Sequence, residues 1–169
     1  NGTLVNFNGS GTDYTATFIP DGQGACTIDV LGSTFTDAAG NVNSAATQFT
    51  WTFDSNAPTL SAVSIASNNA NTTTLAKVGD VITLTMTASE AISTPMINLQ
   101  VGGIAIADAS ITYVDTSGSA GTAWTAAYTT AAGDTGGAVT YSIAFSDLAG
   151  NAGTAVTTST DSSDVTFDK

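Results

Sequence analysis

The chain has 169 residues, 42% of them hydrophobic, which is ample for a packed core and argues against disorder. Its formal net charge of −12 comes from fourteen acidic residues against Lys77 and Lys169, and this excludes the basic patches that nucleic acid or an anionic membrane surface requires. With no histidine and one cysteine, Cys26, the chain cannot use imidazole chemistry, an internal disulfide or a Cys-rich zinc site.

Alternating apolar and polar residues predict β-strands along the chain, with negligible helix. In chain order the strand patterns cover residues 14–20, 25–30, 81–89, 123–130 and 139–145. Clusters of Gly, Asn, Asp and Ser separate them and indicate turns. In the second pattern Cys26 shares a strand face with Ile28 and Val30, so we expect it to be a buried apolar residue. No apolar run is long enough for a membrane span and no signal-type segment opens the chain, so we expect a soluble segment whose export signal or anchor lies outside it.

Three sequence segments recur in the same order. "GTDYTATF" (11–18) matches "GTAWTAAY" (121–128), "FTDAAGN" (35–41) matches "FSDLAGN" (145–151), and "WTFD" (51–54) matches "VTFD" (165–168). The spacings predict an internal repeat of about 110–115 residues, which is the size of one β-sandwich domain. Residues 55–169 then form a complete repeat, and residues 1–54 correspond only to the C-terminal half of one.

A half repeat exposes strand edges and half of a hydrophobic core. We therefore expect residues 1–54 to be either a piece of a longer tandem array or a half domain that a neighbouring repeat or another copy of the chain completes by strand addition.

The segments "FTDAAGNVNSAA" and "FTWTFDSNAPT" resemble the bacterial-type Ig-like tandem repeats of large extracellular adhesins, which carry a D-x-x-G-N turn before the last strand and a D-x-x-x-P junction between domains. The resemblance covers both the half repeat and the full repeat. It implies tandem Ig-like, Greek-key β-sandwiches at the cell surface, acting as a stalk or spacer and often stiffened by Ca²⁺ near the domain junctions.

In a sandwich with this topology, the junction and the B–C, D–E and F–G loops lie at one pole. These segments contain an amide and four carboxylates, which together could supply the oxygens that Ca²⁺ takes: Asp54, Asn56, Glu90, Asp115 and Asp147. Asp37 and Asp13 are weaker candidates, because their partners would lie in the missing half of the first repeat. Aspartates in turns also cap backbone N–H groups, and this role explains the presence of the same residues without an ion. Both interpretations stay open.

Two further patterns have simple explanations. Aromatic residues that recur across the repeat, such as Tyr14 with Trp124 and Phe35 with Phe145, are interpreted as core anchors. Three N-x-S/T sequons stand in turn-like sequence and are glycosylation candidates if the source glycosylates, and they begin at Asn1, Asn8 and Asn71.

The leading functional prediction is a non-enzymatic, extracellular structural segment that serves as a stalk, spacer or filament building block. The alternative is a binding module for a glycan, ice or a partner protein, and an exposed flat row of threonines on one face would favour it. An accessory domain of a hydrolase is disfavoured, because the carboxylates stand in turns with no evident cleft between them.

Overall fold

The computed structural model describes all 169 residues, and its regular structure is almost entirely strand. It contains thirteen β-strands and a single turn of 3-10 helix, η1 (Asp108–Ser110), with no α-helix. Accordingly, it contains no helix with the length and apolar character needed to cross a membrane. The all-β class predicted from residue alternation is confirmed.

The chain divides into two compact units, Asn1–Asn56 and Ala57–Lys169. The strands of the first unit are β1 (Gly2–Ser10), β2 (Asp13–Pro20), β3 (Gly24–Ile28) and β4 (Phe49–Phe53). The strands of the second unit are β5 (Leu60–Ser67), β6 (Leu75–Ala76), β7 (Val81–Ala88), β8 (Met96–Val101), β9 (Ile104–Ala105), β10 (Thr112–Asp115), β11 (Ala123–Thr129), β12 (Gly137–Ala144) and β13 (Thr166–Phe167).

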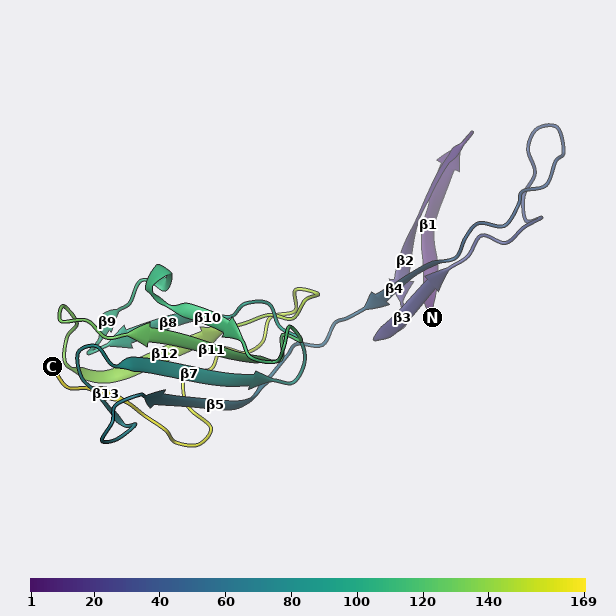
Figure 1. The fold of residues 1–169 in the computed structure, drawn as a ribbon. Helices are drawn as coiled ribbons and strands as arrows, with labels where there is room; N and C mark the ends of the chain where they lie inside the picture. The colour runs from purple at the N-terminus through teal and green to yellow at the C-terminus, as the bar shows by residue number, and fades with distance from the viewer. The chain divides into compact units, whose positions relative to one another are not determined.

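The second unit consists of two sheets that share one hydrophobic core (Figure 1). One sheet has the strand order β10–β11–β7–β5, and the other has the order β6–β13–β12–β8–β9. Every neighbouring pair is antiparallel except the parallel pair of β6 and β13. Alternate residues of the central strands fill the space between the sheets, and those at its centre include Ile82, Leu84, Met86, Ile97, Leu99 and Ile143.

The first unit is built from two two-stranded sheets, the β1–β2 hairpin and the antiparallel β3–β4 pair. Phe18 of β2 contacts Trp51 of β4 edge to face, with ring centroids 4.9 Å apart. Cys26 on β3 is 1% exposed, which confirms its predicted burial, and no other residue of this unit is buried. The unit therefore holds little more than the beginning of a core.

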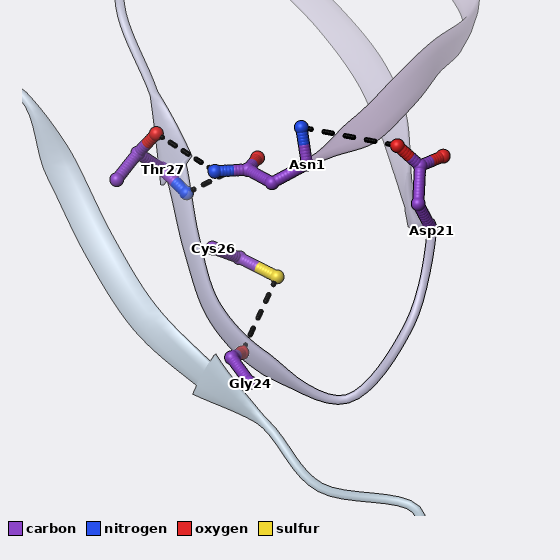
Figure 2. Close-up of polar contacts among 5 residues, drawn as sticks. All are labelled: Asn1, Asp21, Gly24, Cys26 and Thr27. Carbon is purple, nitrogen blue, oxygen red and sulfur yellow. Dashed lines mark hydrogen bonds and ion pairs between the residues drawn. The ribbon is translucent and has the colours of Figure 1, made fainter.

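The N-terminal residue connects the start of the β1–β2 hairpin to β3 (Figure 2). The Asn1 side-chain amide donates to Thr27 Oγ1 at 3.1 Å, and the Thr27 backbone N–H donates to Asn1 Oδ1 at 3.5 Å. The Asn1 backbone nitrogen lies 3.8 Å from Asp21 Oδ2. In the same view, the Cys26 thiol points to the Gly24 carbonyl, 3.7 Å away.

The two D-x-x-G-N segments fold into the same turn. In the first unit, Asn41 donates its backbone N–H to Asp37 Oδ1 and its side-chain amide to Asp37 Oδ2, both at 2.9 Å. In the second unit, Asn151 makes the same two bonds to Asp147, both at 2.8 Å. The glycine of each turn has a positive φ, 89° in the first and 97° in the second, a conformation that favours glycine. The heptapeptide thus specifies its own turn in both units.

Equivalent positions of the two units differ in burial. Phe145 is 6% exposed, which agrees with its predicted role as a core anchor. That prediction is wrong for Phe35 and Tyr14, which are 60% and 57% exposed. The physical reason is that the first unit has no second half of a core to receive these rings. Whether the units are an Ig-like half repeat and full repeat stays a prediction.

Candidate metal centre

Three loops of the second unit, which follow β7, β10 and β12, meet at one end of its sheets. The Ile92 N–H donates to the Gly121 carbonyl at 2.9 Å, and the Ser93 N–H donates to the Ser146 carbonyl at 3.0 Å. Ile92 also forms an isolated antiparallel bridge with Asp147. These backbone contacts hold the loops together without help from a ligand.

The start of the second unit is attached to the loop after β7. The Thr59 N–H donates to Ser89 Oγ at 3.0 Å, the Ser89 N–H donates to the Thr59 carbonyl at 2.8 Å, and Pro58 is fully buried. Asp54 precedes Pro58 by four residues, a distance of at most about 14 Å of extended chain. Chain connectivity therefore keeps Asp54 within reach of Glu90, which follows Ser89.

Asp54, Glu90 and Asp147 form a partly buried acidic triad that could hold a cation. Within the second unit, a carboxylate oxygen of Glu90 and one of Asp147 lie within 4.8 Å of each other. Two oxygens that coordinate one Ca²⁺ at about 2.4 Å can be no more than about 4.8 Å apart, so the spacing fits a single ion. Asp147 is 4% exposed, and the other two side chains are half-buried.

The Asp147 carboxyl group is kept ionised by its turn. Burial by itself raises the pKa of this carboxyl, but hydrogen bonds from the Asn151 side chain and backbone, and from the Gly150 and Ala149 backbone, outweigh burial and hold the pKa below its usual value. A carboxylate oxygen can accept a hydrogen bond and coordinate a metal at the same time, because it has two lone-pair sites. The turn thus presents a charged, oriented ligand.

Hydrogen bonds from Gln23 and Asn56 hold the Asp54 carboxylate. Gln23 Nε2 donates to Asp54 Oδ1 at 2.5 Å, and the Asn56 N–H donates to the same oxygen at 3.1 Å. Gln23 Oε1 in turn accepts the Ser55 N–H at 2.8 Å. Asn56 therefore contributes a backbone donor to this turn, and its side chain is exposed. Sequence reasoning missed Gln23, because a glutamine in a Gly-rich turn carries no motif.

Asp115 is not among the residues that the structure brings together in the triad. Its carboxylate accepts the Ser117 hydroxyl and the Ser117 N–H at Oδ1, the latter at 2.9 Å, and the Gly121 N–H at Oδ2 at 3.1 Å. These bonds, led by the one from the Ser117 side chain, lower the pKa of the Asp115 carboxyl. The loop between β10 and β11 therefore uses Asp115 as a cap.

The two candidates in the first unit also act within their own turns. The pKa of the Asp37 carboxyl is lowered, chiefly by the hydrogen bond from the Asn41 side chain. Asp13 Oδ2 accepts the Thr12 hydroxyl at 3.1 Å. Apart from the triad, the structure has no group of three His, Cys, Asp or Glu side chains close enough to share an ion.

The sequon asparagines lie in different settings. The Asn1 side chain is engaged with Thr27. Asn8 lies exposed on β1, and Asn71 lies exposed in a turn in which its N–H donates to Asn69 Oδ1 at 3.0 Å. All three asparagines are exposed, as glycan attachment requires, and they differ in that the Asn1 side chain bonds to Thr27.

Comparison of the chain with protein-family models, with curated proteins and with solved structures finds no match in any of the three. The triad offers only oxygen ligands, which are the ligands of hard divalent cations.

Proposed function

We propose that the chain is a non-enzymatic segment of an extracellular or cell-surface repeat protein, in which Ig-like β-sandwich units serve as a stalk, spacer or filament building block. The observation that carries the proposal is the same hydrogen-bonded D-x-x-G-N turn in two successive units. A chain that repeats a structural unit in tandem is suited to extension, because each added unit lengthens the same architecture.

Strand order supports the Ig-like assignment of the second unit. If β5, β7, β8, β10, β11, β12 and β13 take the letters A to G in chain order, one sheet reads D–E–B–A and the other contains G–F–C. Constant-type Ig sandwiches have the same division, with A, B, E and D in one sheet and C, F and G in the other.

We further propose that the triad binds Ca²⁺ and stiffens the segment that leads into the second unit. Ca²⁺ takes six to eight oxygens in flexible geometry, and three carboxylates supply up to six. Without a cation, Glu90 and Asp147 repel each other across the spacing described above. A bound ion removes this repulsion and joins the segment before Pro58 to two loops of the second unit.

Thermal unfolding of the full chain in Ca²⁺ and in chelator tests the metal. Because an ion that binds only the folded state raises stability by linkage, Ca²⁺ is expected to raise the unfolding midpoint of the second unit. Glu90→Gln and Asp147→Asn are expected to abolish this increase. Asp164→Asn, which removes an exposed aspartate outside the triad, is the matched control and should keep it. An unchanged midpoint across millimolar Ca²⁺ would overturn the metal site.

Backbone ¹⁵N relaxation tests the spacer role. We expect order parameters of residues 55–57 near 0.85 with Ca²⁺ and below about 0.6 in chelator, since these are typical of rigid and flexible backbone. Low order parameters under both conditions would contradict a stiffened connection, even if Ca²⁺ binds.

A second candidate function rests on the outward face of the β10–β11–β7–β5 sheet. This face is uncharged and consists of small residues across four strands, namely Ala62, Ser64, Ala66, Thr83, Thr85, Thr87, Thr112, Val114, Ala123, Thr125 and Ala127. Three of its threonines lie in one line along β7. A regular array of hydroxyl and methyl groups is suited to a regular surface such as ice.

Adsorption of the chain to growing ice tests this candidate. Thr85→Lys, at the centre of the face, is expected to abolish adsorption, and Thr140→Lys on the outward face of the opposite sheet is expected to leave it intact. Absence of wild-type adsorption rejects the candidate.

A further inference from the structure

The first unit presents an apolar hollow to solvent. A cavity of about 530 Å³ is lined by Phe7, Tyr14, Val30 and Phe35, which are 74%, 57%, 44% and 60% exposed. Other large apolar side chains of the unit are also exposed, namely Leu4, Ile19, Leu31, Val42 and Phe49. A unit of 56 residues that exposes this much apolar surface lacks a cover.

The second unit shows what the equivalent positions look like when they are covered. The Val30 carbonyl accepts the Ala46 N–H at 2.9 Å, and the Ile143 carbonyl accepts the Val156 N–H at 3.1 Å, so Val30 and Ile143 hold equivalent places. Ile143 is 0% exposed, against 44% for Val30. Phe35 and Phe145, which begin the two heptapeptides, differ in exposure in the same way.

The strand pairs extend this equivalence. In the β3–β4 pair, Gly24 stands opposite Phe53, and in the β12–β13 pair Gly137 stands opposite Phe167. The β1–β2 hairpin corresponds to β10–β11, because Tyr14 and Trp124 occupy matching places in their sequences. The first unit is thus the counterpart of β10 to β13.

In the second unit the cover consists of strands that precede β10. β7 pairs with β11, and β8 pairs with β12, placing Ile97 opposite Ile143. β5 extends the first of these sheets and contributes Val63 and Ile65 to the core. In the first unit β2 pairs only with β1 and β3 only with β4, so the edges that β7 and β8 would occupy are open.

We propose that the apolar hollow and the two open edges of the first unit seat a three-stranded segment of the same type as residues 57–111, located directly before Asn1 in the same polypeptide. The inference rests on the repeat organisation of the proposed function, and it is independent of the metal site and of localisation. The segment would add one strand antiparallel to β2 and one antiparallel to β3, and its inward side chains would bury the hollow.

A second copy of this chain is a poorer occupant. Its own β5, β7 and β8 are already committed to a core, where Ile82 and Leu84 are 2% exposed and Met86 is fully buried. They could cover another first unit only if their own unit opened. A segment that immediately precedes Asn1 needs no such rearrangement, since in the second unit the covering strands lead into β10 through η1.

Hydrogen exchange in chelator tests the proposal on two chains, residues 1–169 and the same polypeptide extended upstream by about 55 of its natural residues. We expect only weak protection of β2 and β3 in the shorter chain, as in a marginally stable unit, and at least about tenfold slower exchange in the extended one. Phe35→Asp should restore fast exchange in the extended chain, whereas Ile104→Asp, whose side chain is 59% exposed against 60% for Phe35, should not. A copy of residues 57–111 fused before Asn1 is a second covering segment, and slowing by it also supports the proposal.

Four outcomes overturn it. One is protection of β2 and β3 in a monomeric chain 1–169 that equals their protection in the extended chain, which would mean that the hollow needs no cover. Another is a dimer of chain 1–169 that Phe35→Asp dissociates, which would make a second copy the occupant. The third is an upstream sequence without alternating strand patterns. The last is fast exchange of β2 and β3 in both extended chains while the added segment is itself protected. Because chelator is present throughout, none of these results depends on whether the triad binds Ca²⁺.

Discussion

The matched phenylalanines of the two heptapeptides allow one position of the repeat to be tested in two environments. Phe35 and Phe145 precede turns with the same hydrogen bonds, but their side chains are 60% and 6% exposed. Replacing each with alanine removes the same atoms from the same local structure. We predict that Phe145→Ala destabilises the second unit several times more than Phe35→Ala destabilises the first.

The magnitude follows from burial. Deleting a buried phenylalanine ring costs about 3–5 kcal/mol, which combines lost transfer free energy with a cavity term. Phe145 belongs at the upper part of this range, because a Cβ built on Gly153 would lie 2.2 Å from its ring and the wall of the site is therefore already in close contact. Phe35 keeps only about two fifths of its surface covered. Scaling a full burial of about 1.5–3 kcal/mol by that fraction gives about 1 kcal/mol.

Urea unfolding of the full chain measures both effects. Trp124 reports the second unit in a Trp51→Phe background, and Trp51 reports the first unit in a Trp124→Phe background. Equal m-values for parent and variant would show that the change lies in stability rather than in the compactness of either state. A cost below about 1 kcal/mol for Phe145→Ala, or equal costs for the two variants, would refute the assignment of covered and uncovered halves.

Three further predictions concern the second unit. Hydrogen bonds hold the pKa of the Asp147 carboxyl in the folded state below its usual value. The ionised carboxyl therefore stabilises the fold fully above about pH 4, and this stabilisation is lost as pH falls through the lowered pKa. In thermal melts from pH 6 to 2, the unfolding midpoint of Asp147→Asn should therefore depend less on pH than that of the parent chain. Burial, and the hydrogen bond that the Tyr113 hydroxyl donates to Asp108, raise the pKa of Tyr113 to about 12. The stability of the second unit should therefore fall as pH rises from about 10 through 12. Tyr113→Phe should remove part of that loss of stability, and it should remove one late step from the absorbance titration of the tyrosines at alkaline pH. Gly153→Ala should destabilise by about 1–3 kcal/mol in urea because its Cβ would overlap a buried ring, whereas Gly133→Ala, whose Cβ would meet open space, should change stability by less than about 0.5 kcal/mol.

The regular strands were predictable because their pattern is local. Along β7, Ile82, Leu84 and Met86 alternate with threonines, and a two-residue period admits only one assignment of inward and outward faces. The strands β6 and β9 could not be predicted, since two residues carry no period and their pairing depends on neighbours distant in sequence. The exposure of Phe35 follows from the half repeat that the sequence indicates, since residues 1–54 lack the strands that would cover its ring, and it overrides the core-anchor role that its match with Phe145 predicts.

The candidate site was predictable to the extent that it follows from topology. Glu90 and Asp147 come together because loops after alternate strands of a two-sheet fold meet at the same end, and loop order can be read from the chain. The orientation of Asp115 could not be read in this way. It depends on the course of its loop, in which Gly118, Ser119 and Gly121 have positive φ and bring the Gly121 N–H back to the carboxylate.

The repeated turn bears on how the triad could bind an ion at low cost. Asp37 makes the same bonds to its turn asparagine in an uncovered unit that Asp147 makes beside a packed core, so neighbouring residues alone determine the geometry of the turn. The Asp147 ligand is therefore oriented before any ion arrives, and the loop contacts through Ile92 and Ser93 fix its distance from the Glu90 loop in the same way. The remaining ligand is Asp54, which belongs to the chain segment before the buried Pro58. Asp54 is also oriented within its own turn, by the hydrogen bonds from Gln23 and from the Asn56 N–H. Because no ligand then has to be oriented when an ion binds, the free energy of binding is available mainly to order that segment, which is the property that the proposed spacer between repeats requires.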